Sequence, residues 1–143
     1  ATAETDPRTH PFIKGPDLVA LGNVRRDSGA GEAILLQDGF VVEGAWSSVV
    51  WWQNERLHRV DASIPRLGSV TESALVDHAR FIGAPVDAGR VTPDDLAGSE
   101  VWILSALHGI RVATEWVGGP ELHVEPGRAD YWRRQYRNRR TAL

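Results

Sequence analysis

The chain contains a single lysine, Lys14, whereas its other fifteen Lys/Arg residues are all arginines. A lysine amine can lose its proton and attack a carbonyl carbon to form a Schiff base, which a guanidinium cannot do. Apolar Phe12 and Ile13 precede Lys14, and a Gly-Pro-Asp sequence typical of a helix start follows it. We interpret Lys14 as a candidate catalytic amine at the end of a strand; the alternative is a surface lysine with no chemical task.

Glu43 is the second candidate, because it follows the apolar pair Val41-Val42 at the end of a predicted strand. A carboxylate in this position could bind a ring nitrogen through a charge-assisted hydrogen bond. The alternative is a solvated glutamate at a strand end.

Two further segments could bind a phosphate. Ser69, Val70 and Thr71 lie at a predicted helix N-terminus, where free backbone N–H groups, the helix dipole and two hydroxyls favour an anion. Ser105 follows a predicted buried strand and, with Ala106, begins a loop at a sheet end. The alternative for the helix start is an ordinary cap. None of the five histidines lies at a metal-ligand spacing from another histidine or a carboxylate, so we expect no metal site.

Hydrophobic spacing and turn residues predict the elements that must position these side chains. Asp38-Gly39 and, more weakly, Asn54-Glu55 are typical of two-residue hairpin turns. The Ser69-to-Glu72 capping box predicts a helix that buries Val70, Ala74, Leu75, Ala79 and Ile82 and ends at Gly83. We expect strands over residues 33–36, 40–42, 48–52, 57–60, 101–104 and 112–116, and further helices from Pro16, after Thr92 and over 128–140.

At 143 residues and 15.7 kDa, with 42% hydrophobic and 24% charged residues, the chain fits one α+β domain built on a mixed, barrel-like sheet with flanking helices. Residues 1–12 are expected to be a flexible lead-in to a domain over 13–143. No apolar run is long enough for a membrane span, and we expect no signal peptide. The absence of cysteine excludes disulfides and favours a cytoplasmic protein.

Taken in order, the segments resemble the class IV aminotransferases, the fold-type IV pyridoxal-phosphate enzymes. This family includes branched-chain and D-amino-acid aminotransferases and aminodeoxychorismate lyase. The resemblance extends over residues 13–113, and its motifs are Lys14 before a helix, residues 29–36, residues 41–44, residues 67–71 and residues 100–107.

The resemblance implies a role for each candidate residue. Lys14 matches the lysine that holds pyridoxal 5'-phosphate as an internal aldimine and later moves the proton. Glu43 matches the acid that keeps the pyridine nitrogen protonated. Ser69, Val70 and Thr71 match the cup around the cofactor phosphate, and Ser105 and Ala106 match a second loop that touches it. The implied fold is the large domain of the D-amino-acid aminotransferase-like proteins, and the implied assembly is a homodimer.

The chain also departs from the family pattern. Ser48 stands where the family usually has asparagine, Gly68 replaces a frequent proline, and Ala106 stands where many members carry a hydroxyl. Nothing matches the family's first half, and the chain contains no methionine, so we expect an N-terminal half of the same protein to be missing.

The leading interpretation is an aminotransferase that moves an amino group from an amino acid to a 2-oxo acid. The alternatives are a lyase of the same family that releases pyruvate from aminodeoxychorismate, and a non-catalytic fragment or degenerate member. The basic, aromatic segment 131–140 could also be a nucleic-acid surface. Basic residues at the C-terminal end of a helix are stabilised by the helix dipole, which explains this segment without a nucleic acid, so we expect no nucleic-acid partner. We also expect no membrane partner.

Overall fold

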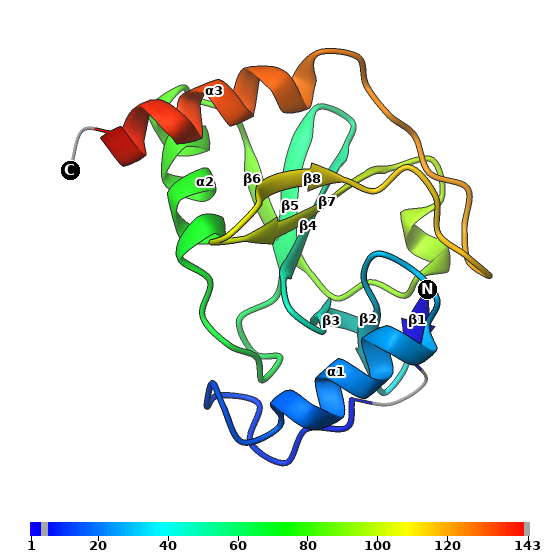
Figure 1. Cartoon of the computed structure of the whole chain (residues 1–143). Coiled ribbons are helices and arrows are strands. Elements are labelled where there is room, and N and C mark those ends of the chain that lie inside the picture. Colours follow the sequence, from blue (N-terminus) through cyan, green and yellow to red (C-terminus); the bar gives the residue numbers. More distant parts are fainter. Residues whose placement is uncertain (4–5, 142–143) are drawn as a thin grey trace.

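The computed structural model describes residues 1–3 and 6–141, without the side chains of residues 3 and 139–141, and these residues form two β-sheets and three α-helices (Figure 1). The smaller sheet has the order β1 (Thr2–Ala3), β2 (Ile34–Gln37), β3 (Phe40–Gly44). The larger sheet has the order β6 (Val86–Gly89), β5 (Arg56–Val60), β4 (Ser48–Gln53), β7 (Glu100–Ser105), β8 (Gly109–Val112). The helices are α1 (Leu18–Asp27), α2 (Val70–Phe81) and α3 (Arg128–Thr141).

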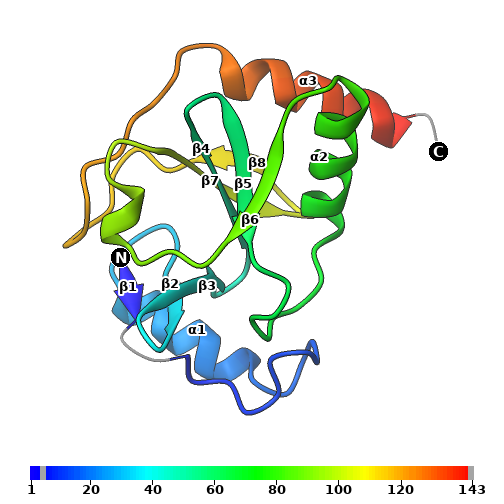
Figure 2. The same cartoon turned by 180° about the vertical axis from the view of Figure 1, so that it is seen from behind.

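Both sheets are mixed, since β1 pairs with β2 and β5 with β6 in parallel while the other pairs are antiparallel. Helices α2 and α3 lie together beside the larger sheet, and α1 lies beside the smaller one (Figures 1 and 2). The predicted α+β architecture with a mixed sheet and flanking helices is therefore the observed one.

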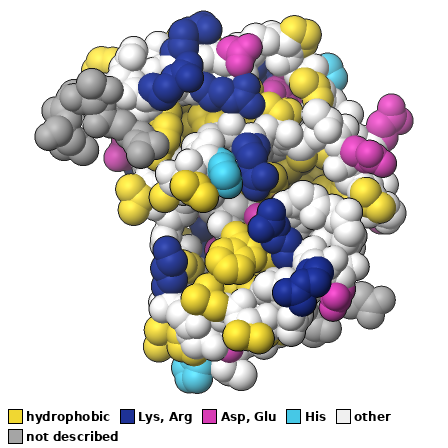
Figure 3. Space-filling model, in the orientation of Figure 1, with side chains coloured by type: hydrophobic (Ala, Val, Ile, Leu, Met, Phe, Trp, Pro, Cys, Tyr) yellow, Lys and Arg dark blue, Asp and Glu magenta, His cyan; other side chains and the backbone are white. Residues whose placement is uncertain are grey.

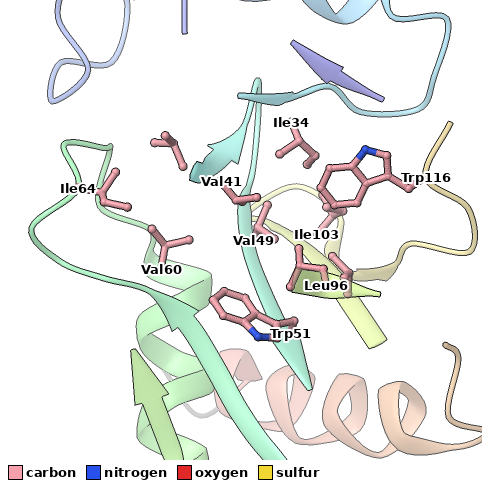
Figure 4. Packing of buried hydrophobic residues seen from close by; sticks show 11 residues of the cluster. Ile34, Val41, Val49, Trp51, Val60, Ile64, Leu96, Ile103 and Trp116 are labelled. Atoms are coloured by element: carbon pink, nitrogen blue, oxygen red, sulfur yellow. The ribbon is translucent and has the colours of Figure 1, made fainter. Parts of the chain in front are cut away.

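Strand β4 lies at the centre of the larger sheet and is buried on both faces. Side chains alternate along a strand, so Val49 and Trp51 enter one core cluster while Val50 and Trp52 enter another. The first cluster joins the two sheets (Figure 4). The second joins the larger sheet to α2 and α3. Burial on both faces explains why this strand is a continuous apolar run rather than an alternating pattern.

Both predicted hairpin turns are present. Asp38 and Gly39 have φ of 52° and 80°, and Asn54 and Glu55 have φ of 50° and 58°. Two successive positive φ angles define the turn whose twist matches that of paired strands. The β2–β3 and β4–β5 hairpins are therefore set by local sequence.

Helix α3 is held on the larger sheet by a buried carboxylate and by aromatic packing. Glu100, 1% exposed, accepts hydrogen bonds from Trp102 Nε1 at 2.9 Å and from Arg128 Nη1 at 2.8 Å. Trp132 of α3 lies edge-on to Trp102, with ring centroids 6.1 Å apart. Trp132 is 4% exposed and therefore packs on the domain.

Several predicted elements differ from the structure. The buried face of helix α2 is shifted by about one residue from the predicted face. Val70 and Ile82, which were predicted to be buried, are exposed. The side chains that face the sheet and α3 include Thr71, Leu75, Val76 and Ala79. The segment after Thr92 forms only a 3-10 turn (Asp94–Leu96), and β8 ends at Val112 instead of spanning 112–116. Helix α1 begins after Asp17, so Pro16 precedes it.

Residues 1–12 also differ from the expected lead-in at two places. Thr2 and Ala3 pair with Ile34 and Leu35 of β2, and the side chain of Arg8 is buried. Residues 4 and 5 of this segment lie outside the described part of the chain. Within the described part, no helix is long and apolar enough to cross a membrane.

The packing of the larger sheet leads to a stability prediction. Leu57, 0% exposed, lies in the cluster between this sheet and α2, whereas Leu107 is 82% exposed. Leu57→Ala is expected to lower the free energy of unfolding by about 2–5 kcal/mol, because it leaves a cavity in the core. Leu107→Ala is expected to change it by less than about 0.5 kcal/mol. Urea denaturation measures both, and equal losses would contradict this description of the core.

Candidate functional site

A cavity of about 420 Å³ lies where several chain segments meet near the carboxyl end of β7. The start of β4 and the end of β7 form one rim, because Ser48 pairs with Leu104 in the antiparallel register. The loop before α1 and the first turn of α2 complete the lining. All seven residues predicted from the sequence line this single cavity: Lys14, Glu43, Ser69, Val70, Thr71, Ser105 and Ala106.

Lys14 is exposed on the turn that leads into α1, not at the end of a strand as predicted, because residues 11–17 form turns and bends. The carboxylate of Asp17 accepts hydrogen bonds from the backbone N–H of His10 and from Thr9 Oγ1, both at 3.1 Å, and so closes this turn. The His10 N–H, the largest contribution, and Thr9 lower the pKa of Asp17. Gly15, with φ of 133°, adopts a backbone conformation that other residues disfavour. Lys14 takes part in no ion pair among the described residues.

Glu43 lies at the end of β3 and is 6% exposed. Its Oε1 accepts hydrogen bonds from Arg8 Nη1 and, at 3.2 Å, from the backbone N–H of Leu67. No described residue donates to Oε2. Burial raises the pKa of the Glu43 carboxyl, although hydrogen bonding to Arg8 and Leu67 and the charge of Arg66 act to lower it.

The first turn of α2 presents unpaired backbone donors to the cavity. Ser69 caps the helix, with its Oγ accepting from the Glu72 N–H at 3.2 Å and from Ser48 Oγ at 2.9 Å. No acceptor is found among the described residues for the N–H groups of Val70 and Thr71, as expected for a helix start. Glu72 binds Arg66 instead of completing the capping box.

Ser105, the last residue of β7, and Ala106, in the turn that leads to β8, also line the cavity. Ser105 Oγ accepts a hydrogen bond from the His108 N–H at 3.1 Å, which leaves its own proton available to donate. The antiparallel pairing of β4 with β7 brings this turn to the edge of the sheet where β4 begins.

Comparison with known proteins gives the family. A sequence model described as amino-transferase class IV matches residues 6–116. The chain belongs to the class IV aminotransferases. No curated protein matches it.

Solved structures of longer proteins share the fold. A protein of Legionella pneumophila proposed to be a 4-amino-4-deoxychorismate lyase has 16% identity and a TM-score of 0.84, with 96% of this chain and 54% of that chain covered. The PLP-bound form of a hypothetical aminotransferase from Mycobacterium tuberculosis has 27% identity and a TM-score of 0.74, over 83% and 43% of the two chains. The branched-chain amino acid aminotransferase from Thermobaculum terrenum, in its PLP form, has 21% identity and a TM-score of 0.81, over 96% and 47%.

The class IV aminotransferase family and fold predicted from the sequence are thus confirmed, and this chain spans about half the length of these solved structures. The matched segment of the family contains all seven predicted site residues. Helix α3 follows that segment.

Sequence reasoning missed two residues that contact the predicted ones, Arg8 and Tyr136. Arg8, with its partner Asp6, lies in the polar segment expected to be a lead-in, where no periodicity or motif distinguished either residue. Tyr136 of α3 lies with its hydroxyl 3.2 Å from Thr71 Oγ1. Only a folded chain brings residues 71 and 136 together, so no local signal was available.

The cap of α2 supports a prediction about the site's framework. Ser69→Ala removes the acceptor for the Glu72 N–H and is expected to lower the free energy of unfolding by about 1 kcal/mol. Asp77→Ala, at an exposed position in the same helix that makes no contact with the cap, is the control and is expected to change it by less than about 0.5 kcal/mol. Thermal or urea denaturation measures the difference, and equal effects of the two variants would show that the cap is not holding the helix start.

Proposed function

We propose that this chain is the cofactor-binding half of a pyridoxal 5'-phosphate-dependent aminotransferase that moves an amino group from an amino acid to a 2-oxo acid. One observation carries the proposal: a single cavity is lined by the only lysine of the chain, a buried carboxylate and two helix N–H groups that have no acceptor among the described residues. Membership of the class IV aminotransferases and the PLP-bound relative at 27% identity support it.

The donor set suits each part of the cofactor. The cavity volume of about 420 Å³ is in the range of small-molecule sites, roughly 300–1,000 Å³. Oε2 of Glu43 is available to accept from a ring N–H, and the Val70 and Thr71 N–H groups are available to a phosphate at the positive end of the helix dipole. Ser105 Oγ and the backbone of Ala106 would bind the phosphate from the other side.

Pyridoxal phosphate, when bound, supplies an aldehyde that condenses with amines and a ring that takes up the electron pair of the adjacent carbon. Lys14 would hold the cofactor covalently through Nζ. Once substrate displaces it, the same Nζ would accept a proton from the substrate carbon and return one, as a general base and acid. Glu43 would keep a proton on the ring nitrogen, and the cavity walls would fix the cofactor's orientation.

A lyase of the same family that releases pyruvate would share these residues and differ in how the substrate pocket directs bond cleavage. The similarity to the Legionella protein, at 16% identity, extends to the fold alone, so the aminotransferase remains the proposal. Because the solved relatives are about twice as long, we include in the proposal a second half of the same protein and a homodimer that complete the substrate pocket.

The covalent site can be tested directly. Incubation with pyridoxal phosphate followed by borohydride reduction is expected to attach one cofactor to Lys14, located by peptide mapping. The assay is sharp because Lys14 is the only lysine of this sequence, so a lysine adduct within it can lie only at residue 14. Lys14→Arg is the matched control and is expected to give no adduct at residue 14. No adduct at residue 14 of the wild type would contradict the proposal.

The reaction itself is tested with the cofactor-loaded protein. Amino transfer from an amino acid to a 2-oxo acid is expected, and Lys14→Ala is expected to lower kcat by on the order of 10² to 10⁴ because it removes the proton-transfer group. Release of pyruvate from aminodeoxychorismate without amino transfer would replace the aminotransferase by the lyase. Activity in neither assay would count against both.

A further inference from the structure

Arg8 is held between two carboxylates although its side chain is only 7% exposed. Its Nε donates to both oxygens of Asp6, at 2.8 and 3.0 Å, and its Nη2 donates to Asp6 Oδ2 at 2.5 Å. The remaining arm, Nη1, donates to Glu43 Oε1. Burial lowers the pKa of Arg8, but the bonds to Asp6 and Glu43 outweigh this and raise it above its ordinary value.

Two carboxylates and one guanidinium leave this cluster with a net charge of −1 when all three are ionised. Burying an unbalanced charge is costly unless a ligand or further donors compensate it. Both hydrogen bonds to Glu43 go to Oε1, so the uncompensated charge remains on the residue that lines the cavity.

The other charged groups near Glu43 do not bind its carboxylate. Arg66 acts on Glu43 through its charge alone, since its hydrogen bonds of 2.7 Å go to Glu72, which also pairs with Arg59 at 3.9 Å. Glu32, close to Gly44, accepts from Ser47 Oγ at 2.7 Å and pairs with Arg111 at 3.9 Å. Lys14 lines the same cavity and makes no ion pair with Glu43. Within the described chain, Arg8 is the cation that touches Glu43.

We propose that Arg8 is a positioning residue: it keeps Glu43 ionised and turned so that Oε2 accepts from a cationic ring N–H of the cofactor. The choice of ligand rests on the proposed function, whereas the hydrogen bond from Arg8 to Glu43 does not. Arginine suits this task because its planar fork binds Asp6 through one edge and still reaches Glu43 with the other arm. Asp6 thereby fixes the orientation of Arg8. The hydrogen bonds run from Asp6 through Arg8 to Glu43, which lines the cavity.

The effect of Arg8 on Glu43 is measured as the pKa of the Glu43 carboxyl in the full chain without cofactor. The method is ¹³C NMR titration of labelled glutamate carboxyls, with the Glu43 signal assigned by its loss in Glu43→Gln. Arg8→Met is expected to raise the pKa of Glu43 by about 1–3, because a neighbouring cation is removed from a buried acid. Arg8→Lys keeps the charge and is expected to raise it less. Arg56→Met, which breaks the exposed pair of Arg56 with Asp87, is the matched control and is expected to leave it unchanged.

The role toward the cofactor is measured as the affinity for pyridoxal phosphate, from the quenching of tryptophan fluorescence. Arg8→Met is expected to weaken binding more at pH 6 than at pH 9, because without Arg8 a larger fraction of Glu43 is protonated at the lower pH. The ratio of variant to wild-type affinity is expected to recover toward pH 9, because Glu43 then ionises without Arg8. A merely structural role would give a loss independent of pH.

The two measurements separate the possible failures. An unchanged Glu43 pKa in a folded Arg8→Met protein would overturn the inference whether or not the wild type binds cofactor. A raised pKa with a pH-independent affinity ratio would overturn the role toward the cofactor. A wild-type chain that binds no pyridoxal phosphate would refute the proposed function and the ligand part of this inference, while the titration would still decide the ion pair. If Arg8→Met does not fold, Arg8→Gln is expected to show the same rise in pKa.

Discussion

The antiparallel pairing of β4 with β7 is the constraint on which the rest of the structure depends. Its register places Ser48 opposite Leu104 and Trp51 opposite Val101. Because side chains alternate, this register sends one set of apolar residues toward the smaller sheet and the other toward α2 and α3. A slip of one residue in this pairing would turn each side chain of the slipped strand to the opposite face of the sheet, and so exchange the two apolar sets. The same register brings the turn that begins at Ser105 to the start of β4, and so forms one rim of the cavity.

Buried glutamates paired with arginines form the second feature of the fold. Glu43 binds Arg8, Glu72 binds Arg66, and Glu100 binds Arg128. The guanidinium fork can donate to both carboxylate oxygens or to two partners at once, which an ammonium cannot do in a fixed plane. This use of arginine accounts for part of the unusual composition. It also sets Lys14 apart, since the one lysine is exposed at the cavity and takes no part in these pairs.

The basic helix α3 has a structural explanation. Figure 3 shows basic side chains gathered over this end of the molecule. Arg128 binds Glu100 and Glu55, and Arg133 donates to the Ile110 carbonyl at 3.0 Å and to Asp130 at 2.8 Å. These arginines fasten the helix to the sheet and to its own first turn. The side chains of residues 139 and 140, part of the nucleic-acid alternative, lie outside the described residues.

Local chemistry was enough to predict much of this protein. Hairpin turns with two positive φ angles need Asp-Gly or Asn-type residues, and a helix start needs a serine cap, so both can be read from neighbouring residues. The ordered motifs around Lys14, Glu43 and Ser69 also indicated the family before any contact was known. The buried face of α2, the short turn at Asp94 and the edge strand β6 could not be predicted in this way, because packing partners distant in sequence decide them.

At the candidate site, too, some features follow from the sequence and others only from the tertiary structure. The types of residue able to form a Schiff base, bind a ring nitrogen or bind a phosphate were determined by the sequence, since these are properties of individual side chains and of a helix start. Their convergence on one cavity, the pairing of Arg8 with Glu43 and the contact of Tyr136 with Thr71 were decided only by the tertiary structure. Charge burial and strand register act across the whole fold, and no local pattern of residues encodes them.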